Sequence, residues 1–220
     1  MDTSGEMRIM APDLERFTVE VLMKLGVPEA EARIVADVLV LADLRGVDSH
    51  GVGRLHLYVT GLETGVIARR AEVRVVAAYP ALALVDGGKG LGQVVGYRAM
   101  QRCLDMAEQA GMACVTVTNS NHYGIAAYYA LMALERDMIG ISLTNSRPHV
   151  PPTFGRQAML GTNPIAMAVP TGRERPWVLD MATSAIPLGK VEVAQRLGKR
   201  LREGLAVDGD GLPTSDPDVV

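Results

Sequence analysis

The stretch VTVTNSNHYG, residues 115–124, decides the fold expected for the middle of the chain. Its β-branched run, 115–118, fits a pleated strand, and the Asn, Ser and Gly residues that follow suit a tight turn. A helix over 125–136 is expected next, so His122 falls on a loop between a strand and a helix. Such loops often present reacting groups, and an imidazole with a pKa of roughly 6.5 exchanges a proton near neutral pH. His122 is therefore a candidate for acid/base chemistry, and a loop histidine that only bonds backbone is the alternative.

Composition restricts the class of protein. The 220 residues carry a net charge of -3 and 48% hydrophobic residues, enough for a sizeable core. There is neither a basic stripe for nucleic acid nor an apolar run that would span a membrane. The N-terminus lacks the pattern of a secretory signal, and Cys103 and Cys114 have no metal-ligand spacing. We expect two reduced core thiols, no metal site and a cytoplasmic location.

Apolar residues at helical spacing predict two helices, 12–25 and 28–45, that form a hairpin at the start of the chain. Each has acidic residues in its first turn and a glycine after its end. The other expected elements are strands at 72–78, 81–86, 138–144, 165–169 and 177–180, a helix over 91–110 and helical structure from 186 to 204.

A glycine-punctuated stretch, residues 46–65, follows the hairpin and carries a polar cluster. His50, Arg54 and Tyr58 are four residues apart and share one face if a helix begins by His50. A guanidinium can hold a carboxylate by two parallel hydrogen bonds, so this trio is a candidate anchor for a small acid. The alternative is a solvated Arg54 and a Tyr58 at the edge of the core.

Five glycines between 87 and 96 suggest a dinucleotide-binding turn at first sight. Their spacing departs from G-x-G-x-x-G, and the strand that follows ends in Thr118–Asn119 with no acidic residue for a ribose. We therefore expect these glycines to let a helix enter closely. An aspartate-rich turn near 208–211 lacks the ligand spacing of a calcium loop.

Three polar loops, 119–124, 145–148 and 180–184, each follow an expected strand. Asn, Ser and Arg at 145–147 suit a phosphate or hydroxyl ligand. The loops would form one binding rim if the strand ends meet at the same edge of a sheet.

Five motifs occur in an order that resembles a known family. They are ADLRGVDSHGVGRLHLYV at 42–59, VDGGKGLGQ at 85–93, VTNSNHYG at 117–124, GTNPIAMAVP at 161–170 and VLDMATS at 178–184. The chain resembles the malate/L-lactate dehydrogenase family, which also contains ureidoglycolate, sulfolactate and cyclic imino-acid reductases. That family is distinct from the Rossmann-type lactate and malate dehydrogenases.

The resemblance implies an NAD(P)-dependent oxidoreductase that interconverts 2-hydroxy and 2-oxo acids, usually as a homodimer. It implies an α+β fold that is not of the Rossmann type, in which a largely antiparallel sheet binds the dinucleotide beside an N-terminal helical domain. The expected domains are a helical domain at 1–70, a cofactor-binding domain at 71–190 and the start of a C-terminal region at 191–220.

The motif matches assign roles to individual residues. His122 takes the acid/base position, with His50 as the second candidate. Arg54 and Tyr58 match positions near the substrate carboxylate, and Ser49 and His50 line the same pocket. The positions that match cofactor contacts, for NAD or NADP, are Ser146, Asp180, Met181 and Ala182.

Family members continue beyond the segment at which this chain ends, Val220. The sequence therefore leaves open a truncated gene, a fragment, or a missing part supplied from elsewhere. Two alternatives to the dehydrogenase follow: an inactive remnant that only binds a ligand or partner, and a cyclic imino-acid reductase that uses the same carboxylate handle.

Overall fold

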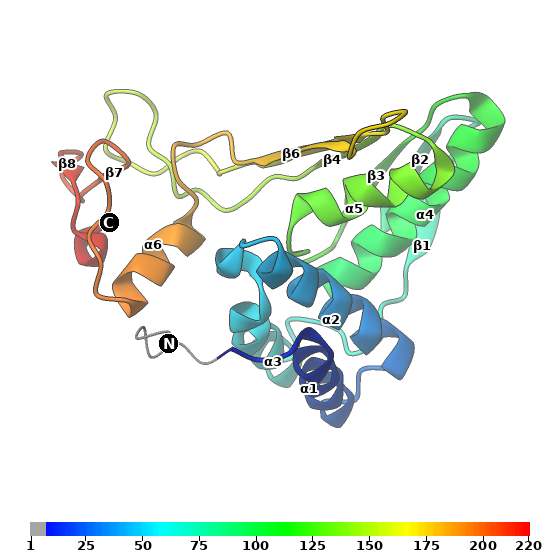
Figure 1. The fold of residues 1–220 in the computed structure, drawn as a ribbon, viewed down its shortest axis with the longest axis horizontal. Coiled ribbons are helices and arrows are strands. Elements are labelled where there is room, and N and C mark those ends of the chain that lie inside the picture. The colour runs from blue at the N-terminus through cyan, green and yellow to red at the C-terminus, as the bar shows by residue number, and fades with distance from the viewer. Residues whose placement is uncertain (1–7) are drawn as a thin grey trace. The chain divides into compact units, whose positions relative to one another are not determined.

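A computed structural model describes residues 8–220 and divides into two compact units (Figure 1). One unit ends at Gly124 and the other begins at Ile125. The domain limits expected at 70 and 190 rest on the family resemblance and stay a prediction. Both units mix helices with small sheets, and most strand pairs are antiparallel, which confirms the expected fold class.

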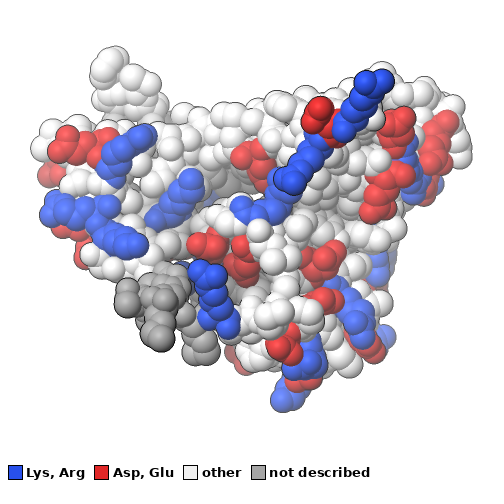
Figure 2. Space-filling model, in the orientation of Figure 1, with Lys and Arg blue, Asp and Glu red and all other residues white. Residues whose placement is uncertain are grey.

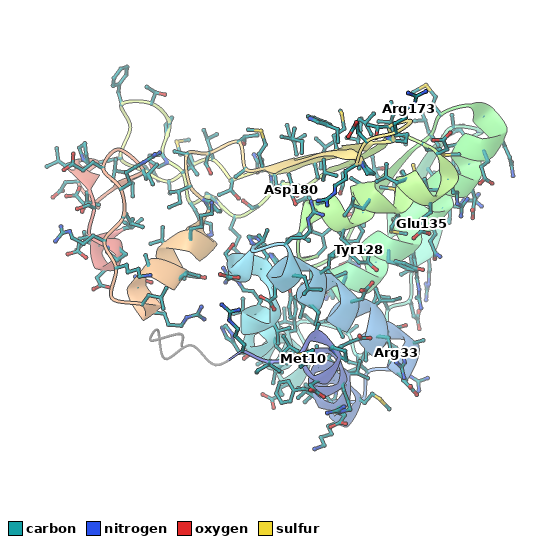
Figure 3. The ribbon with its side chains drawn as sticks, in the orientation of Figure 1. Met10, Arg33, Tyr128, Glu135, Arg173 and Asp180 are labelled. Atoms are coloured by element: carbon teal, nitrogen blue, oxygen red, sulfur yellow. The ribbon has the colours of Figure 1, made fainter. Side chains whose placement is uncertain are left out.

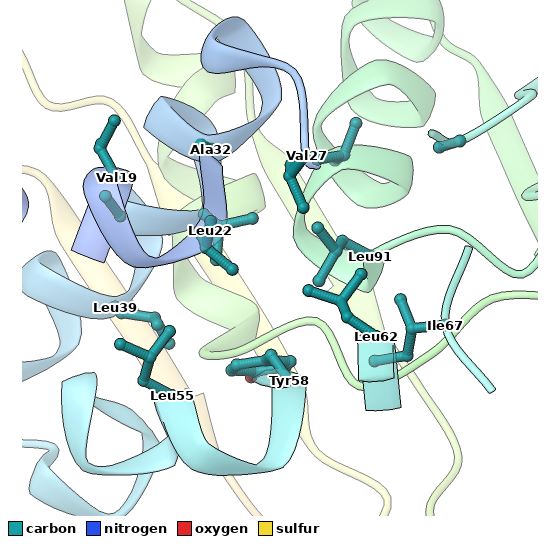
Figure 4. Close-up of a cluster of buried hydrophobic side chains, with 14 of the residues drawn as sticks. Val19, Leu22, Val27, Ala32, Leu39, Leu55, Tyr58, Leu62, Ile67 and Leu91 are labelled. Atoms are coloured by element: carbon teal, nitrogen blue, oxygen red, sulfur yellow. The ribbon is translucent and has the colours of Figure 1, made fainter. Parts of the chain in front are cut away.

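The first unit begins with the predicted helical hairpin, α1 (Ala11–Lys24) and α2 (Glu29–Leu44). Gly26 has a φ of 86°, a left-handed conformation that suits glycine and ends the first helix. The apolar faces pack into a core that extends to helix α3 (Leu55–Glu63), where Tyr58 is 2% exposed (Figure 4). Tyr58, a residue of the candidate site, is therefore anchored in this core.

The segment between α2 and α3 forms two 3-10 turns, Asp48–His50 and Val52–Arg54. The condition for one shared face, a helix that begins by His50, is therefore not met. A tertiary contact holds this segment: Oδ2 of Asp43 in α2 accepts a hydrogen bond from the Val52 N–H at 2.8 Å, and a Cβ on Gly51 would lie 1.7 Å from Oδ1 of the same carboxylate. Gly51 is extended at this point, which separates the two turns.

The sheet of the first unit has the order β1 (Arg74–Ala78), β2 (Leu82–Asp86), β3 (Cys114–Thr118). β1 and β2 are antiparallel, whereas β2 and β3 are parallel and are connected by helix α4 (Gly92–Ala110). Both cysteines are free, but only Cys103 is half-buried. Cys114 is exposed, so its expected place in the core is wrong, because it begins β3 on a face that the unit leaves open.

The second unit begins with α5 (Ala126–Met132) and a 3-10 turn, Ala133–Arg136. An antiparallel sheet follows, in the order β4 (Gly140–Leu143), β5 (Ile165–Val169), β6 (Trp177–Met181). Since β5 runs opposite to both neighbours, β4 and β6 end at the same edge.

The C-terminal part is less helical than expected. Helix α6 (Leu188–Arg196) ends well before residue 204, because Gly198 adopts a φ of 60°, which no α-helix continues. After it come the short strands β7 (Ala206–Val207) and β8 (Pro213–Thr214) and a 3-10 turn, Pro217–Val219.

Figure 2 shows acidic and basic side chains interspersed on the face in view, as the composition indicates. Within residues 8–220, no helix combines the length and apolar character needed to cross a membrane.

Candidate functional site

The loop that carries His122 is fixed against the glycine-rich turn of the same unit. The side-chain amide of Asn121 donates to the carbonyls of Lys89 and Gly90, both at 2.9 Å. A Cβ on Gly92 would lie 2.2 Å from the Asn121 carbonyl oxygen and 2.3 Å from that of His122. The helix start therefore touches the loop backbone directly, and the expectation that the glycines permit a close approach is confirmed.

Asp86 secures the other end of this loop. Its carboxylate accepts hydrogen bonds from the Gly88 N–H at 2.8 Å and from the Asn119 side chain at 2.9 Å. Both bonds lower the pKa of Asp86, and the bond from Gly88 has the larger effect. The carboxylate is therefore ionised near neutral pH. The polar residues of the VTNSNHYG motif thus hold the loop in one conformation.

His122 meets residues that are far away in the sequence. The Tyr58 hydroxyl lies 2.7 Å from its Nδ1, and the Gly124 N–H donates to the same nitrogen at 3.4 Å. The His50 ring stacks on the His122 ring, with centroids 5.5 Å apart and planes inclined by 22°. The structure therefore brings together both histidines that the sequence singled out.

The surroundings of His122 disfavour its charged form. Desolvation by neighbouring protein lowers the pKa of His122 to about 4, and the charges of His50 and Arg54 lower it further in the same direction. The residue as a whole nevertheless stays exposed to solvent. Burial raises the pKa of Tyr58 well above its ordinary value, so the phenol keeps its proton.

Ser49 and Arg54 complete the cluster. The Ser49 hydroxyl lies 2.9 Å from Nδ1 of His50, and Nε of Arg54 donates to the Ser49 carbonyl at 2.7 Å. Arg54 is half-buried, which excludes the fully solvated alternative. Tyr58 belongs to the core and also bonds His122, and its role toward a substrate stays a prediction.

Ser146, an expected cofactor contact, lies in the second unit after β4. Its hydroxyl accepts the Thr162 N–H at 2.8 Å and lies 3.0 Å from the Thr162 hydroxyl, and its N–H donates to the Asn163 side chain at 3.1 Å. The Thr183 N–H donates to the Thr162 carbonyl at 2.8 Å. Loops 145–148 and 180–184 therefore meet through residues 161–163, while loop 119–124 belongs to the other unit.

Asp180 has a structural bond in addition to its expected contact with the cofactor. Its carboxylate accepts the Ala127 N–H at 2.9 Å, which places a negative charge at the start of α5 (Figure 3). Met181 pairs with Ile165 in the sheet, and Ala182 follows at the strand end. The roles of Asp180, Met181 and Ala182 toward a cofactor stay a prediction.

Sequence reasoning missed three residues that shape these sites: Asp43, Gln93 and Thr162. Asp43 stands in ADLRGVDSHGVGRLHLYV, Gln93 in VDGGKGLGQ and Thr162 in GTNPIAMAVP, so the motifs contained all three, but spacing alone assigned none of them a contact. Among residues 8–220, no group of three or more His, Cys, Asp or Glu side chains gathers as a set of metal ligands.

Its helices and largely antiparallel sheets place the chain outside the Rossmann class of nucleotide-binding proteins. Comparison with known sequences identifies the family. Residues 9–220 match the family described as malate/L-lactate dehydrogenase, and the chain belongs to that family.

The relatives include proteins that act on different small acids. A malate dehydrogenase of Pyrococcus horikoshii is 55% identical over 208 residues, which are 94% of this chain and 58% of the relative. An L-sulfolactate dehydrogenase of Methanocaldococcus jannaschii is 46% identical over 210 residues, 95% of this chain and 61% of the relative. The chain thus spans about three fifths of the length of these relatives.

The fold agrees with solved structures of the same family. The structure of malate dehydrogenase from Entamoeba histolytica superposes with a TM-score of 0.93 at 37% identity. The match covers 96% of this chain and 59% of that one. The non-Rossmann fold expected from the sequence is confirmed.

Proposed function

We propose that the protein is an NAD(P)-dependent oxidoreductase that interconverts a small 2-hydroxy acid and its 2-oxo acid, with His122 as the acid/base. The observation that carries the proposal is the 2.7 Å bond between the Tyr58 hydroxyl and Nδ1 of His122, beside His50 and Arg54. Membership of the malate/L-lactate dehydrogenase family supports the same reaction class.

Arg54 is the proposed anchor for the substrate carboxylate. Its Nε bond to the Ser49 carbonyl fixes the plane of the guanidinium, which restricts how a carboxylate can meet it. Ser49, His50 and Tyr58 are the further substrate-binding residues. A cyclic imine that carries a carboxylate offers the same handle, so imino-acid reduction is the alternative within the enzyme class.

His122 is proposed to hold and move the proton. Since its Nδ1 is engaged by Tyr58 and Gly124, Nε2 is the nitrogen that meets the substrate. In reduction the protonated His122 gives its Nε2 proton to the developing alkoxide while its Nδ1 proton is held by the Tyr58 oxygen, and in oxidation the reverse transfer returns a proton to Nε2. A bound carboxylate would offset the positive charge of Arg54, one of the factors that lower the pKa of His122, and so favour its protonation.

The residues proposed to hold the cofactor are Ser146, Asp180, Met181 and Ala182. Hydroxyl and amide groups of Ser146, Thr162 and Asn163 gather at one strand edge, a donor set that suits the hydroxyls and phosphates of a dinucleotide. A Cβ on Gly161 would lie 2.5 Å from the Ser146 carbonyl oxygen, so only glycine keeps these loops together. When bound, NAD or NADP supplies or accepts the hydride.

The test compares His122→Gln with His56→Gln. His56 is exposed on α3 and its Nδ1 bonds the Gly53 carbonyl, so it provides a histidine control outside the cluster. We expect His122→Gln to lower kcat for 2-oxo acid reduction by about a hundredfold or more and His56→Gln to leave it unchanged. NAD(P)H oxidation is followed with pyruvate, oxaloacetate, sulfopyruvate and a cyclic imine carboxylate.

Three results would change the assignment. Full activity of His122→Gln together with an inactive His50→Gln would give the proton transfer to His50. Turnover of the imine alone would select the reductase. Binding of NAD(P)H without turnover of any substrate would favour the inactive remnant.

The family resemblance also supports a homodimer in the cytoplasm, with a small acid as its partner and no nucleic acid or membrane. Analytical ultracentrifugation tests the homodimer, and cell fractionation tests the cytoplasmic location. A monomer at micromolar concentration would contradict the proposed homodimer.

A further inference from the structure

Asn119 is a left-handed residue at the start of the loop that carries His122. It follows β3 directly and has a φ of 53°, a conformation that residues other than glycine seldom adopt. Asparagine tolerates it better than most residues, because its short side chain can form local hydrogen bonds. A strand that simply continued would carry residues 120–122 onward along β3, so the left-handed turn at Asn119 sets the direction in which the chain reaches His122.

The side chain of Asn119 is bonded to a carboxylate at the end of the neighbouring strand. Its amide nitrogen donates to Oδ1 of Asp86 at 2.9 Å, and the Gly88 N–H donates to the same oxygen at 2.8 Å. Asp86 ends β2, which pairs in parallel with β3. One carboxylate therefore bonds both turns that leave this strand pair, the glycine-rich turn and the His122 loop.

The backbone of Asn119 is held by the glycine-rich turn as well. The Lys89 N–H donates to the Asn119 carbonyl at 2.9 Å, and a Cβ on Gly87 would lie 3.0 Å from that carbonyl oxygen. Lys89 is itself left-handed, with a φ of 57°. Residues in such conformations persist where the surrounding structure over-determines them, and they cluster at functional sites. Two of them bonded to each other just before His122 indicate that the position of this loop matters.

The loop ends in contacts that require this position. The Tyr58 hydroxyl lies 2.7 Å from Nδ1 of His122, and the His122 ring stacks on that of His50. Tyr58 is 2% exposed and belongs to the core, so it cannot follow a displaced loop. A displacement of about 1 Å would break the hydrogen bond, and at a catalytic group it can lower turnover about a hundredfold.

We propose that Asp86 and Asn119 are positioning residues: the bond from the Asn119 amide to the Asp86 carboxylate holds Asn119 in its left-handed conformation and so places His122 against Tyr58. The catalytic consequence rests on the proposed function, whereas the position of the ring does not. Because a single oxygen of Asp86 accepts both bonds, this role requires an acceptor at position 86 and not a negative charge.

The test uses four variants of the 220-residue chain. Asn119→Asp keeps the shape of the side chain and its tolerance of a left-handed backbone, but removes the donor. Asp86→Ala removes the acceptor, and Asp86→Asn retains it. Thr116→Val is the matched control, because the Thr116 hydroxyl bonds the Ala83 carbonyl at 3.3 Å, between the same two strands but outside the loop.

The position of His122 is measured without reference to activity. Nuclear Overhauser effects between the rings of Tyr58 and His122, whose centroids are 6.0 Å apart, are recorded with labelled tyrosine and histidine. The cross-peaks are identified by their loss in His122→Gln. We expect them in the parent, in Asp86→Asn and in Thr116→Val, and we expect their loss in Asn119→Asp and Asp86→Ala. A lower melting temperature with intact cross-peaks, as expected of Thr116→Val, separates a structural role from a positioning one.

The kinetic expectation follows from the same geometry. In an active enzyme, kcat for 2-oxo acid reduction should fall about ten- to a hundredfold in Asn119→Asp and in Asp86→Ala. KM for the 2-oxo acid should change by less than about twofold, because the anchor Arg54 is held by Ser49 on another segment. Asp86→Asn is expected to recover most of the activity that Asp86→Ala loses.

Cross-peaks of parental strength in Asn119→Asp overturn the inference, and if that variant does not fold, the same result in Asp86→Ala overturns it. Loss of the cross-peaks in Asp86→Asn also overturns it, because the charge of Asp86 and not the bond would then hold the loop. The expected spectra in a chain without dehydrogenase activity would instead refute the proposed function alone.

Discussion

Acidification should destabilise the first unit through His122, and replacement of that residue should remove the effect. In the folded protein the pKa of His122 is lowered from 6.5 to about 4. Between these values the unfolded chain binds a proton that the folded protein does not, so stability falls as the pH drops. The contribution is fully present above pH 6.5 and is lost as the pH approaches 4.

The magnitude follows from the size of the pKa shift. At about 1.36 kcal/mol per pKa unit, a shift from 6.5 to about 4 corresponds to roughly 3 kcal/mol. His122 is an exposed residue, so solvent screening reduces this value, and we expect about 1 to 2 kcal/mol. His122→Gln should be that much less sensitive than the parent to a change from pH 7 to pH 4.

Urea unfolding followed by far-UV circular dichroism at several pH values is the assay. The fluorescence of Trp177 would mislead, because this residue, the single tryptophan of the chain, lies on β6 in the second unit. The control His56→Gln is expected to retain the acid sensitivity of the parent. Equal loss of stability in the parent and in His122→Gln would refute the reasoning, since other groups would then account for all of it.

Two further substitutions test how the site is built. Arg54→Lys should raise KM for 2-oxo acids by about tenfold with a smaller effect on kcat, because a point charge cannot replace a forked contact to a carboxylate. Arg45→Lys, at an exposed position, is the control. An unchanged KM in Arg54→Lys would show that Arg54 is not the anchor. Gly92→Ala should destabilise the first unit by about 2 to 3 kcal/mol, because its Cβ would meet two backbone carbonyls. A Cβ on Gly172 would have nothing within 4 Å, so the control Gly172→Ala should change stability by less than about 0.5 kcal/mol. Equal effects of the two substitutions in thermal unfolding would contradict the predicted clash.

Local patterns predicted the elements of the fold well. The spacing of apolar residues located the hairpin, 11–44, and β-branched runs located most strands, because these signals depend only on neighbours in sequence. The failures have tertiary or conformational causes. The turn at Gly51 is held by a hydrogen bond from the Val52 N–H to Asp43, which lies on the preceding helix, and Gly198 ends α6 through its backbone conformation.

The candidate site was predicted by residue type but not by geometry. Motif matches singled out His50, Tyr58 and His122, yet the bond between Tyr58 and His122 joins positions 64 residues apart, which periodicity does not reveal. The burial of Gln93 depends on how α4 meets the loop at His122 and is equally invisible in the sequence.

Because Asp43 contacts the turn at Gly51, substitutions at these two positions should be coupled during evolution. Position 43 lies near the end of α2, and its carboxylate accepts a hydrogen bond from Val52, just after the turn that carries Ser49 and His50. A homologue that loses this carboxylate must also rebuild the turn, so positions 43 and 51 should change together across lineages. A substitution at only one of these positions should lower the activity of the protein before it prevents folding.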